Sequence, residues 1–293
     1  MSLNAFALII LAGLIHAVWN IAAKKAGGDA RFAIFTAVLM MLVWAPLGWW
    51  LGRSAVPLWG AREWAIVALS GVLHVLYYVV LLRGYRKADL TVVYPLARGT
   101  GPLVTALVAV TLLGERLSLT AVLGIAGVVA GVFLIAGGPG LLRAGRDEQA
   151  RRLVRKGMQY GVLTGLFIAS YTVVDGYAVK VMLLSPILVD YMGNFVRVLV
   201  RAPVALRKPA ELAPLWAAQW RFALLVALVS PVAYVLVLFA MQSAPLSHVA
   251  PAREVSMLFA ALLGGHLLGE GDRAARLAGA LLIACGVVAL ALG

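Results

Sequence analysis

The chain has 293 residues, of which 63% are hydrophobic and 13% charged, and its mean hydropathy is +0.98. A single soluble core could not bury that much apolar surface, so a water-soluble globular protein is excluded. The net charge of +13 would favour nucleic-acid binding in a soluble protein. Here the charges lie between apolar segments, so we expect membrane lipids and no nucleic acid as partners.

Ten apolar windows are long enough to cross a bilayer, since about 20 helical residues span about 30 Å of hydrocarbon. They centre on residues 3–23, 31–51, 64–82, 91–113, 118–136, 157–179, 183–203, 219–241, 246–268 and 274–292. Their continuous apolar runs predict helices rather than the alternating segments of a membrane barrel. The first window lacks the flanks of a signal peptide, so we expect it to be mature structure.

The first and sixth spans each place polar side chains inside an apolar helix. His16 and Asn20 lie four residues apart on one helical face, with Trp19 beside them. The sixth span carries Tyr171 and Asp175. A carboxylate inside a membrane span is costly and normally faces a cavity or a partner, so Asp175 is expected either to line a cavity or to pair with a buried arginine.

The third and eighth spans carry aromatic and histidine side chains at similar depth: His74, Tyr77, Tyr78 and Tyr234. His74 could act as a proton relay, a metal ligand or a hydrogen-bonded histidine in a cavity. No second metal ligand stands at suitable spacing, so we expect no metal and no cofactor. Pro231 in the eighth span removes a backbone donor and frees a carbonyl.

The fourth and ninth spans are copies of one another. At a spacing of 155 residues, Arg98 pairs with Arg253, Gly114-Glu115 with Gly269-Glu270, Gly124 with Gly279 and Gly131 with Gly286. Residues 1–136 and 157–293 are therefore predicted to be two five-helix repeats, joined by a basic linker at residues 137–156. An odd number of spans per repeat requires the second repeat to be inverted.

Prolines accompany both repeated arginines, so we expect both helices to be weakened at equivalent depth. Pro95 and Pro102 bracket Arg98, and Pro251 precedes Arg253 and Glu254. Such interruptions mark the binding sites of transporters, and arginine suits a carboxylate. The alternatives are that Arg253 pairs with Glu254 or Asp175 and that Arg98 extends to the membrane surface. Glu115 and Glu270 are interpreted as turn residues.

The seventh span carries a polar stripe at helical spacing, formed by Asp190, Asn194, Arg197 and Arg201. Such a stripe cannot face lipid, and Asp190 can pair with Arg197. Glycines spaced by four residues, at 157, 161 and 165 and at 127 and 131, predict close helix packing. We expect this packing within a monomer.

Basic residues concentrate on alternate connections. The odd-numbered connections carry 17 Lys and Arg residues and the even-numbered ones carry four. Because positive loops remain in the cytoplasm, the odd connections are predicted to be cytoplasmic and both termini periplasmic.

The two repeats, the aromatic-then-lysine end of the first span and the paired P-x-L…LGE endings of spans four and nine resemble the drug/metabolite transporter (DMT) superfamily, EamA type, and most closely the YddG-type bacterial amino-acid exporters. The resemblance implies ten helices in two inverted halves around a central cavity lined by spans 1, 3, 4, 6, 8 and 9. Members of this superfamily commonly have cytoplasmic termini, whereas the charge count predicts the reverse.

We expect no enzyme activity from this sequence, because it has no nucleotide-binding loop, serine elbow or metal-ligand cluster. The expected function is export of amino acids across the bacterial inner membrane by alternating access, with broad selectivity that includes aromatic or other apolar ones. The alternatives are an exporter of lipophilic drugs or other small metabolites and, less favoured, a membrane-embedded enzyme. The candidate substrate-binding residues are His16, Trp19, Asn20, His74, Tyr77, Tyr78, Tyr94, Arg98, Tyr171, Asp175, Tyr234, His248, Arg253, Glu254 and Ser256.

The charge distribution predicts that a reporter active only in the periplasm is active when fused after Gly293. A matched fusion after the basic residue Lys87 should be inactive, because that connection is predicted to be cytoplasmic. The opposite pattern in the two fusions would contradict the orientation.

Overall fold

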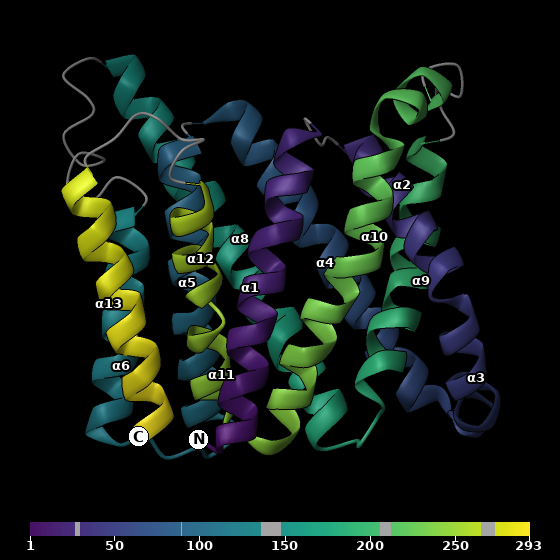
Figure 1. Cartoon of the computed structure of the whole chain (residues 1–293), viewed down its shortest axis with the longest axis horizontal. Helices are drawn as coiled ribbons and strands as arrows, with labels where there is room; N and C mark the ends of the chain where they lie inside the picture. The colour runs from purple at the N-terminus through teal and green to yellow at the C-terminus, as the bar shows by residue number, and fades with distance from the viewer. Residues whose placement is uncertain (27–29, 89, 136–147, 206–211, 265–272) are drawn as a thin grey trace.

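The computed structural model of the chain describes residues 1–26, 30–88, 90–135, 148–205, 212–264 and 273–293. These ranges form helices that run side by side, with both termini at the same end of the molecule (Figure 1). The amino group of Met1 donates a hydrogen bond to the carbonyl oxygen of Ala291 at 2.9 Å, which ties the two ends of the chain together. The chain is therefore an all-helical protein, as predicted.

The helices follow the predicted apolar windows closely. The first half contains α1 (Leu3–Lys25), α2 (Ala30–Val43), α3 (Ala45–Ala55), the short 3₁₀ helix η1 (Val56–Leu58), α4 (Ala61–Lys87), α5 (Leu90–Thr111) and α6 (Leu119–Ile135). The second half contains α8 (Glu148–Lys180), α9 (Pro186–Ala205), α10 (Leu212–Ser243), α11 (Leu246–Ala252), α12 (Val255–Gly264) and α13 (Arg273–Leu292).

Five of the described helices are long and apolar enough to cross a bilayer, namely those in α1, α4, α5, α8 and α10. The pair α2 and α3 adds a sixth if its 63° bend lies within one span, and α6 and α13 contain shorter apolar helices. The windows at α9 and at α11–α12 do not meet the same criterion within the described residues, because α9 carries several charges and the other helix is broken.

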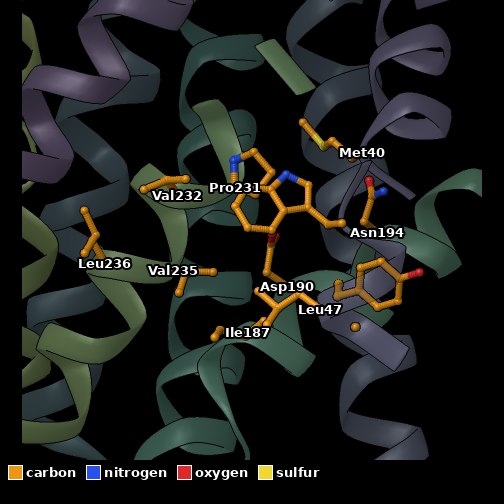
Figure 2. A pocket seen from close by; sticks show the side chains of 12 residues that line it. Met40, Leu47, Ile187, Asp190, Asn194, Pro231, Val232, Val235 and Leu236 are labelled. Carbon is orange, nitrogen blue, oxygen red and sulfur yellow. The ribbon is translucent and has the colours of Figure 1, made fainter. Parts of the chain in front are cut away.

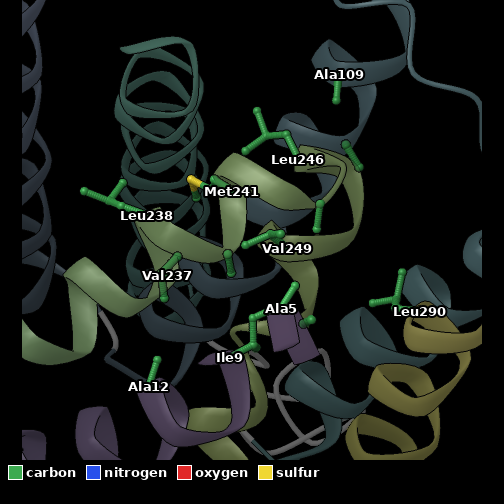
Figure 3. Close-up of a cluster of buried hydrophobic side chains, with 14 of the residues drawn as sticks. Ala5, Ile9, Ala12, Ala109, Val237, Leu238, Met241, Leu246, Val249 and Leu290 are labelled. Carbon is green, nitrogen blue, oxygen red and sulfur yellow. The ribbon is translucent and has the colours of Figure 1, made fainter. Parts of the chain in front are cut away.

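Each helix packs against partners from the other half of the chain. α5 and α4 pack on α8, α10 and α12 pack on α1, and α6 packs on α13. In addition, α2 contacts α10 and α9, and α4 contacts α9. A cluster of buried apolar side chains joins α1, α10 and α11, with Ile9, Leu238 and Val249 among its members (Figure 3).

Glycine allows the closest of these contacts. A methyl group added at Gly131 of α6 would lie 2.5 Å from the carbonyl oxygen of Gly279 in α13, and one added at Gly124 would lie 2.8 Å from that of Gly286. At the α5–α8 contact, a methyl group at Gly165 would lie 2.5 Å from Thr100. The predicted glycine faces are therefore confirmed as helix contacts within one chain.

The prediction that both proline-containing helices are weakened agrees with a break in the ninth window, whereas α5 shows no break. α5 runs unbroken through Pro95 and Pro102 and packs against α8. The ninth window breaks into α11 and α12 after Pro251, and Arg253 and Glu254 occupy the break.

The carbonyl freed by Pro231 finds a partner on another helix. α10 continues through Pro231, so the carbonyl four residues earlier, at Ala227, has no backbone donor. The indole N–H of Trp44 donates to this oxygen at 3.0 Å. Trp44 stands at the bend between α2 and α3, so this bond fixes the bend against α10.

The structure describes only part of the predicted linker at residues 137–156. Residues 136–147 and the second LGE turn, Gly269-Glu270, lie outside the described residues. Residues 148–156, which we placed in the linker, form the first turns of α8. Glu148 and Arg152, which are four residues apart on this helix, form an ion pair at 2.6 Å across one helical turn.

The glycine contacts generate a stability prediction. Gly131→Ala should destabilise the protein by about 1–3 kcal/mol, because backbone atoms of α13 occupy the space that the new methyl group needs. Gly127→Ala on the same helix is the matched control, since its methyl group would lie 3.4 Å from its nearest neighbour. The measurement is the melting temperature in detergent, and equal melting temperatures for the two variants would contradict the packing argument.

Candidate functional site

Two arginines, one from each half of the chain, meet on one glutamate. Arg98 of α5 lies 2.8 Å from the Oε2 atom of Glu254, and its guanidinium also donates to the hydroxyl of Ser256 at 3.0 Å. Arg253 lies 3.8 Å from the other oxygen of Glu254. We call Arg98, Arg253, Glu254 and Ser256 the arginine cluster.

The arginine cluster lies inside the protein, because the side chain of Glu254 is only 1% exposed and those of Arg98 and Arg253 are 17% and 12% exposed. The alternative that Arg98 extends to the membrane surface is therefore wrong. The pairing of Arg253 with Glu254 is confirmed, and Arg98 shares the same carboxylate. Two guanidinium charges against one carboxylate leave one positive charge in excess.

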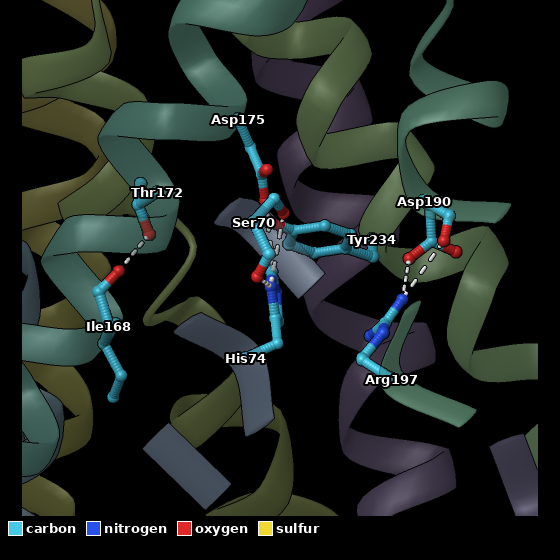
Figure 4. A network of polar contacts seen from close by, with 8 residues as sticks. All are labelled: Ser70, His74, Ile168, Thr172, Asp175, Asp190, Arg197 and Tyr234. Atoms are coloured by element: carbon cyan, nitrogen blue, oxygen red, sulfur yellow. Dashed lines mark hydrogen bonds and ion pairs between the residues drawn. The ribbon is translucent and has the colours of Figure 1, made fainter. Parts of the chain in front are cut away.

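A second polar group surrounds Asp175 (Figure 4). The hydroxyl of Tyr234 in α10 donates a hydrogen bond to Oδ2 of Asp175, and Nε2 of His74 in α4 lies 4.0 Å from the same oxygen. Nδ1 of His74 donates to the carbonyl oxygen of Ser70 at 2.9 Å. We call Ser70, His74, Asp175 and Tyr234 the Asp175 network.

The alternative that Asp175 pairs with a buried arginine is wrong within the part of the chain that the structure describes. Asp175 is fully buried, and its polar neighbours are Tyr234, His74 and Ser70 rather than a guanidinium. Its Oδ1 atom has no hydrogen-bond partner. The prediction that His74 is a hydrogen-bonded histidine is confirmed by its contact with Ser70.

Tyr171 connects the Asp175 network to the arginine cluster. Its ring stacks on His74 with centroids 3.9 Å apart, and the guanidinium of Arg253 lies 5.8 Å from the ring centre. Tyr77 lies beside it, with ring centroids 5.6 Å apart. Eight of the predicted residues thus form one continuous group, namely His74, Tyr77, Arg98, Tyr171, Asp175, Tyr234, Arg253 and Glu254, with Ser256 at its edge.

The other predicted residues lie around or away from this group. His16 interacts electrostatically with Arg98 and Arg253 and has its ring 4.7 Å from that of Trp19. Asn20 is exposed and donates back to the carbonyl of its own helix.

Tyr94 lies one helical turn before Arg98, interacts with it electrostatically and is 38% exposed. Two further predicted residues are separate from the arginine cluster. The guanidinium of Arg201 lies over the ring of Tyr78, 4.6 Å from its centre. His248 lies in α11 with its Nδ1 atom 3.2 Å from the hydroxyl of Ser247, so it contacts the start of α11 rather than the arginine cluster.

Asp190 and Asn194 of the polar stripe on α9 are buried in protein, and Arg197 and Arg201 are partly buried. Arg197 pairs with Asp190 at 2.8 Å, and the amide of Asn194 donates to the carbonyl oxygen of Ala37 in α2 at 2.9 Å. Asp190 and Asn194 also line an apolar cavity of about 170 Å³ between α2, α3, α9 and α10 (Figure 2). This cavity is separate from the arginine cluster.

Glu115 does more than the predicted turn position implies. It follows Gly114, whose φ is +69°, and its carboxylate accepts bonds from the backbone N–H groups of Leu246 and Ser247 at 2.8 and 2.9 Å. These N–H groups begin α11 and would otherwise have no partner. Lys180 lies 3.7 Å from the same carboxylate. Only the repeated glutamate in the LGE motif pointed to this contact in the sequence.

The pKa of Glu115 reflects these contacts. Burial acts to raise the pKa, but the hydrogen bonds from Ser247 and Leu246 and the charge of Lys180 outweigh burial and hold the pKa below its ordinary value. Among the described residues, no group of three or more His, Cys, Asp and Glu side chains is placed to hold a metal ion.

Comparisons with known proteins agree with the all-helical fold. Residues 3–137 and 155–292 each match the EamA-like transporter family. A solved crystal structure is similar over 98% of both chains with a TM-score of 0.74 and 17% sequence identity, which supports the fold alone. No curated protein matches the chain.

The buried pair on α9 generates a prediction by double substitution. Asp190→Asn or Arg197→Gln alone should destabilise the protein by about 3–5 kcal/mol, because each leaves one buried charge without its partner. The double variant should recover much of the loss. Folded yield in the membrane and melting temperature are the measurements, and a double variant as unstable as the sum of the single ones would contradict the pair.

Glu115 generates a pH prediction. Since the pKa of Glu115 is lower in the folded protein, its contribution to stability is complete above the unfolded value of about 4.3 and is lost as the pH falls through the folded value. The melting temperature of Glu115→Gln should therefore be lower at pH 7 and change less between pH 5 and 3. Glu148→Gln, at an exposed ion pair, is the control and should match the wild type. An undiminished pH dependence in Glu115→Gln would contradict this role.

Proposed function

The chain belongs to the EamA-like transporter family, and we propose that it is a secondary active transporter that exports amino acids across the bacterial inner membrane with broad selectivity. Membership in the family supports a DMT-type transporter rather than an enzyme. We further propose that its substrates are amino acids and that, within the family, it is most similar to the YddG-type exporters.

The arginine cluster is the observation that carries the choice of substrate. Arg98 and Arg253 share one carboxylate, so the group has one uncompensated positive charge away from water. An isolated charge in the membrane is costly, and a substrate carboxylate would neutralise it. Arginine binds carboxylates through two parallel hydrogen bonds, which suits an amino-acid substrate.

Aromatic rings beside the arginine cluster support broad selectivity. Tyr77, Tyr171 and Tyr234 form a wall with ring centroids 5.6 to 6.5 Å apart. Rings of this kind offer apolar faces to a substrate side chain, and apolar walls distinguish side chains by only about 1–3 kcal/mol per methylene. Amino acids with aromatic or other apolar side chains fit this wall best.

The pairing of helices supports two inverted five-helix repeats. Exchanging the halves turns the α4–α8 contact into the α10–α1 contact and the α5–α8 contact into the α12–α1 contact. The α6–α13 and α2–α9 contacts map onto themselves. Ten spans in total, with residues 1–136 and 157–293 as the two repeats, are part of this proposal. Alternating access is then a rocking of one half against the other around the arginine cluster.

Asp175 favours one alternative function. A buried carboxylate without an arginine partner, surrounded by tyrosine rings, would suit a lipophilic cation better than an amino acid. The excess positive charge of the neighbouring arginine cluster opposes a cation. Transport assays with both substrate classes separate the two functions.

The carboxylate role of Arg98 is tested with the double variant Arg98→Gln/Glu254→Gln, which removes the Arg98–Glu254 pair and leaves Arg253 as the one remaining charge of the arginine cluster. Amino-acid affinity should fall roughly 10- to 150-fold, since a charge-assisted bond to a carboxylate contributes about 1.5–3 kcal/mol. Amino amides, which have no carboxylate, should be affected little.

The matched control is Asp190→Asn/Arg197→Gln, which removes another buried pair outside the arginine cluster. It should transport both substrate classes as the wild type does. Competition against a labelled amino acid in liposomes is the measurement. An equal loss for acids and amides at normal expression would reject the carboxylate role.

A further inference from the structure

A hollow of about 370 Å³ lies between the end of α4 and the first turns of α8. Its described lining residues are Lys87 of α4 and Lys156, Gln159, Tyr160 and Leu163 of α8, and we call it the lysine pocket. Both helix ends lie at the end of the molecule opposite to the two termini (Figure 1). The lysine pocket shares no described residue with the arginine cluster or the Asp175 network, so it is separate from the candidate site.

Two lysines bring uncompensated positive charge into the lysine pocket. Lys87 belongs to the first half of the chain and Lys156 to the second, and neither has an ion pair among the residues that the structure describes. Glu148, the acidic residue described at these two helix ends, is paired with Arg152 instead. Like charges on two neighbouring helices repel, so an anion bound between them lowers the electrostatic energy.

A close helix contact lies directly beneath the two lysines. Gly84 precedes Lys87 by three residues, and a methyl group added at Gly84 would lie 2.9 Å from the Cβ atom of Tyr160, four residues after Lys156. α4 and α8 therefore touch one turn below the two lysines. The lysine pocket is formed by this contact between the two halves, and Tyr160 is both part of the contact and part of the lining.

The lining of the lysine pocket changes from charged to polar to apolar along α8, in the order Lys156, Tyr160 and Leu163. At 1.5 Å per residue, Tyr160 lies about 6 Å and Leu163 about 10 Å deeper than Lys156. The headgroup region on each side of a bilayer is roughly 5–8 Å thick, so the three residues match the phosphate, the ester groups and the acyl chains of a phospholipid. Gln159 and Tyr160 carry donors for ester carbonyls, whereas a free phosphate ion would use the lysines alone.

We propose that the lysine pocket binds an anionic phospholipid, with the phosphate between Lys87 and Lys156 and an acyl chain along Leu163. Basic pockets between membrane-spanning helices are suited to such headgroups. Because the two lysines come from different halves of the chain, the bound lipid stabilises the arrangement in which α4 and α8 are in contact at this end. The site does not depend on which substrate the transporter carries.

The charge contribution is tested by titrating the purified full-length protein in uncharged detergent with short-chain phosphatidylglycerol and counting bound lipid by native mass spectrometry. Lys87→Gln/Lys156→Gln should bind roughly 30-fold more weakly than the wild type, at about fivefold for each lysine. Both side chains are exposed, so this variant should fold normally. Lys24→Gln/Lys25→Gln is the matched control, because it removes two exposed lysines at the end of α1 that do not line the lysine pocket.

Comparison ligands separate a lipid site from other sources of binding. Phosphatidylcholine of the same chain length, whose choline cancels the phosphate charge, should bind at least tenfold more weakly, and inorganic phosphate should not displace the lipid. An equal loss in both lysine pairs would reduce the effect to general surface charge and overturn the site. Displacement by inorganic phosphate at the concentration of the lipid would show a free-anion site and overturn the assignment to a lipid.

The position of the acyl chain is tested in liposomes by fluorescence of Leu163→Trp, after subtraction of the wild-type signal. Phosphatidylglycerol with brominated acyl chains should quench this tryptophan more strongly than brominated phosphatidylcholine does. Val162→Trp is the matched control, since Val162 is similarly exposed but lies about 100° around the helix from Leu163 and does not line the lysine pocket. It should be quenched equally by both lipids. Equal quenching at residue 163 as well would overturn the placement of the lipid.

Discussion

The structure depends on the rule that a charge at membrane depth must be neutralised inside the protein. Arg98 and Glu254 apply this rule across the two halves of the chain, since one residue lies in α5 and the other at the break between α11 and α12. The ion pair with Glu254 that neutralises Arg98 therefore also joins the two halves at the proposed binding site. A substrate that competes for Arg98 acts at the same time on the contact between the halves.

Close helix contacts provide a rigid frame while Arg98 exchanges Glu254 for a substrate. The glycines of α6 and α13 bring two backbones within contact distance, and those of α8 do the same for α5. These contacts tie helices from opposite halves without polar groups. Polar contacts lie elsewhere: Asp175, Asp190 and their partners are buried among α4, α8, α9 and α10, and the arginine cluster lies between α5 and the α11–α12 break. Close apolar helix contacts, combined with a few polar bonds that can change partners, suit a protein that alternates between two access states.

Sequence alone predicted the features that follow from spacing within one helix or from the repeat. The Asp190–Arg197 pair follows from residues two helical turns apart, and the arginine cluster follows from the duplication that places Arg253 opposite Arg98. Contacts between helices were not predictable, because they depend on how each helix is rotated against its neighbours. For this reason Tyr234 as partner of Asp175, Glu115 at the start of α11 and Trp44 at the freed carbonyl of Ala227 were missed.

The most direct test of the central claim is exchange by the wild-type protein in liposomes loaded with a single apolar amino acid. The account predicts that external labelled phenylalanine or leucine enters in exchange for the internal substrate, and that the corresponding amines, which lack the carboxylate, compete at least tenfold more weakly. Exchange of lipophilic cations without any exchange of amino acids would contradict the account.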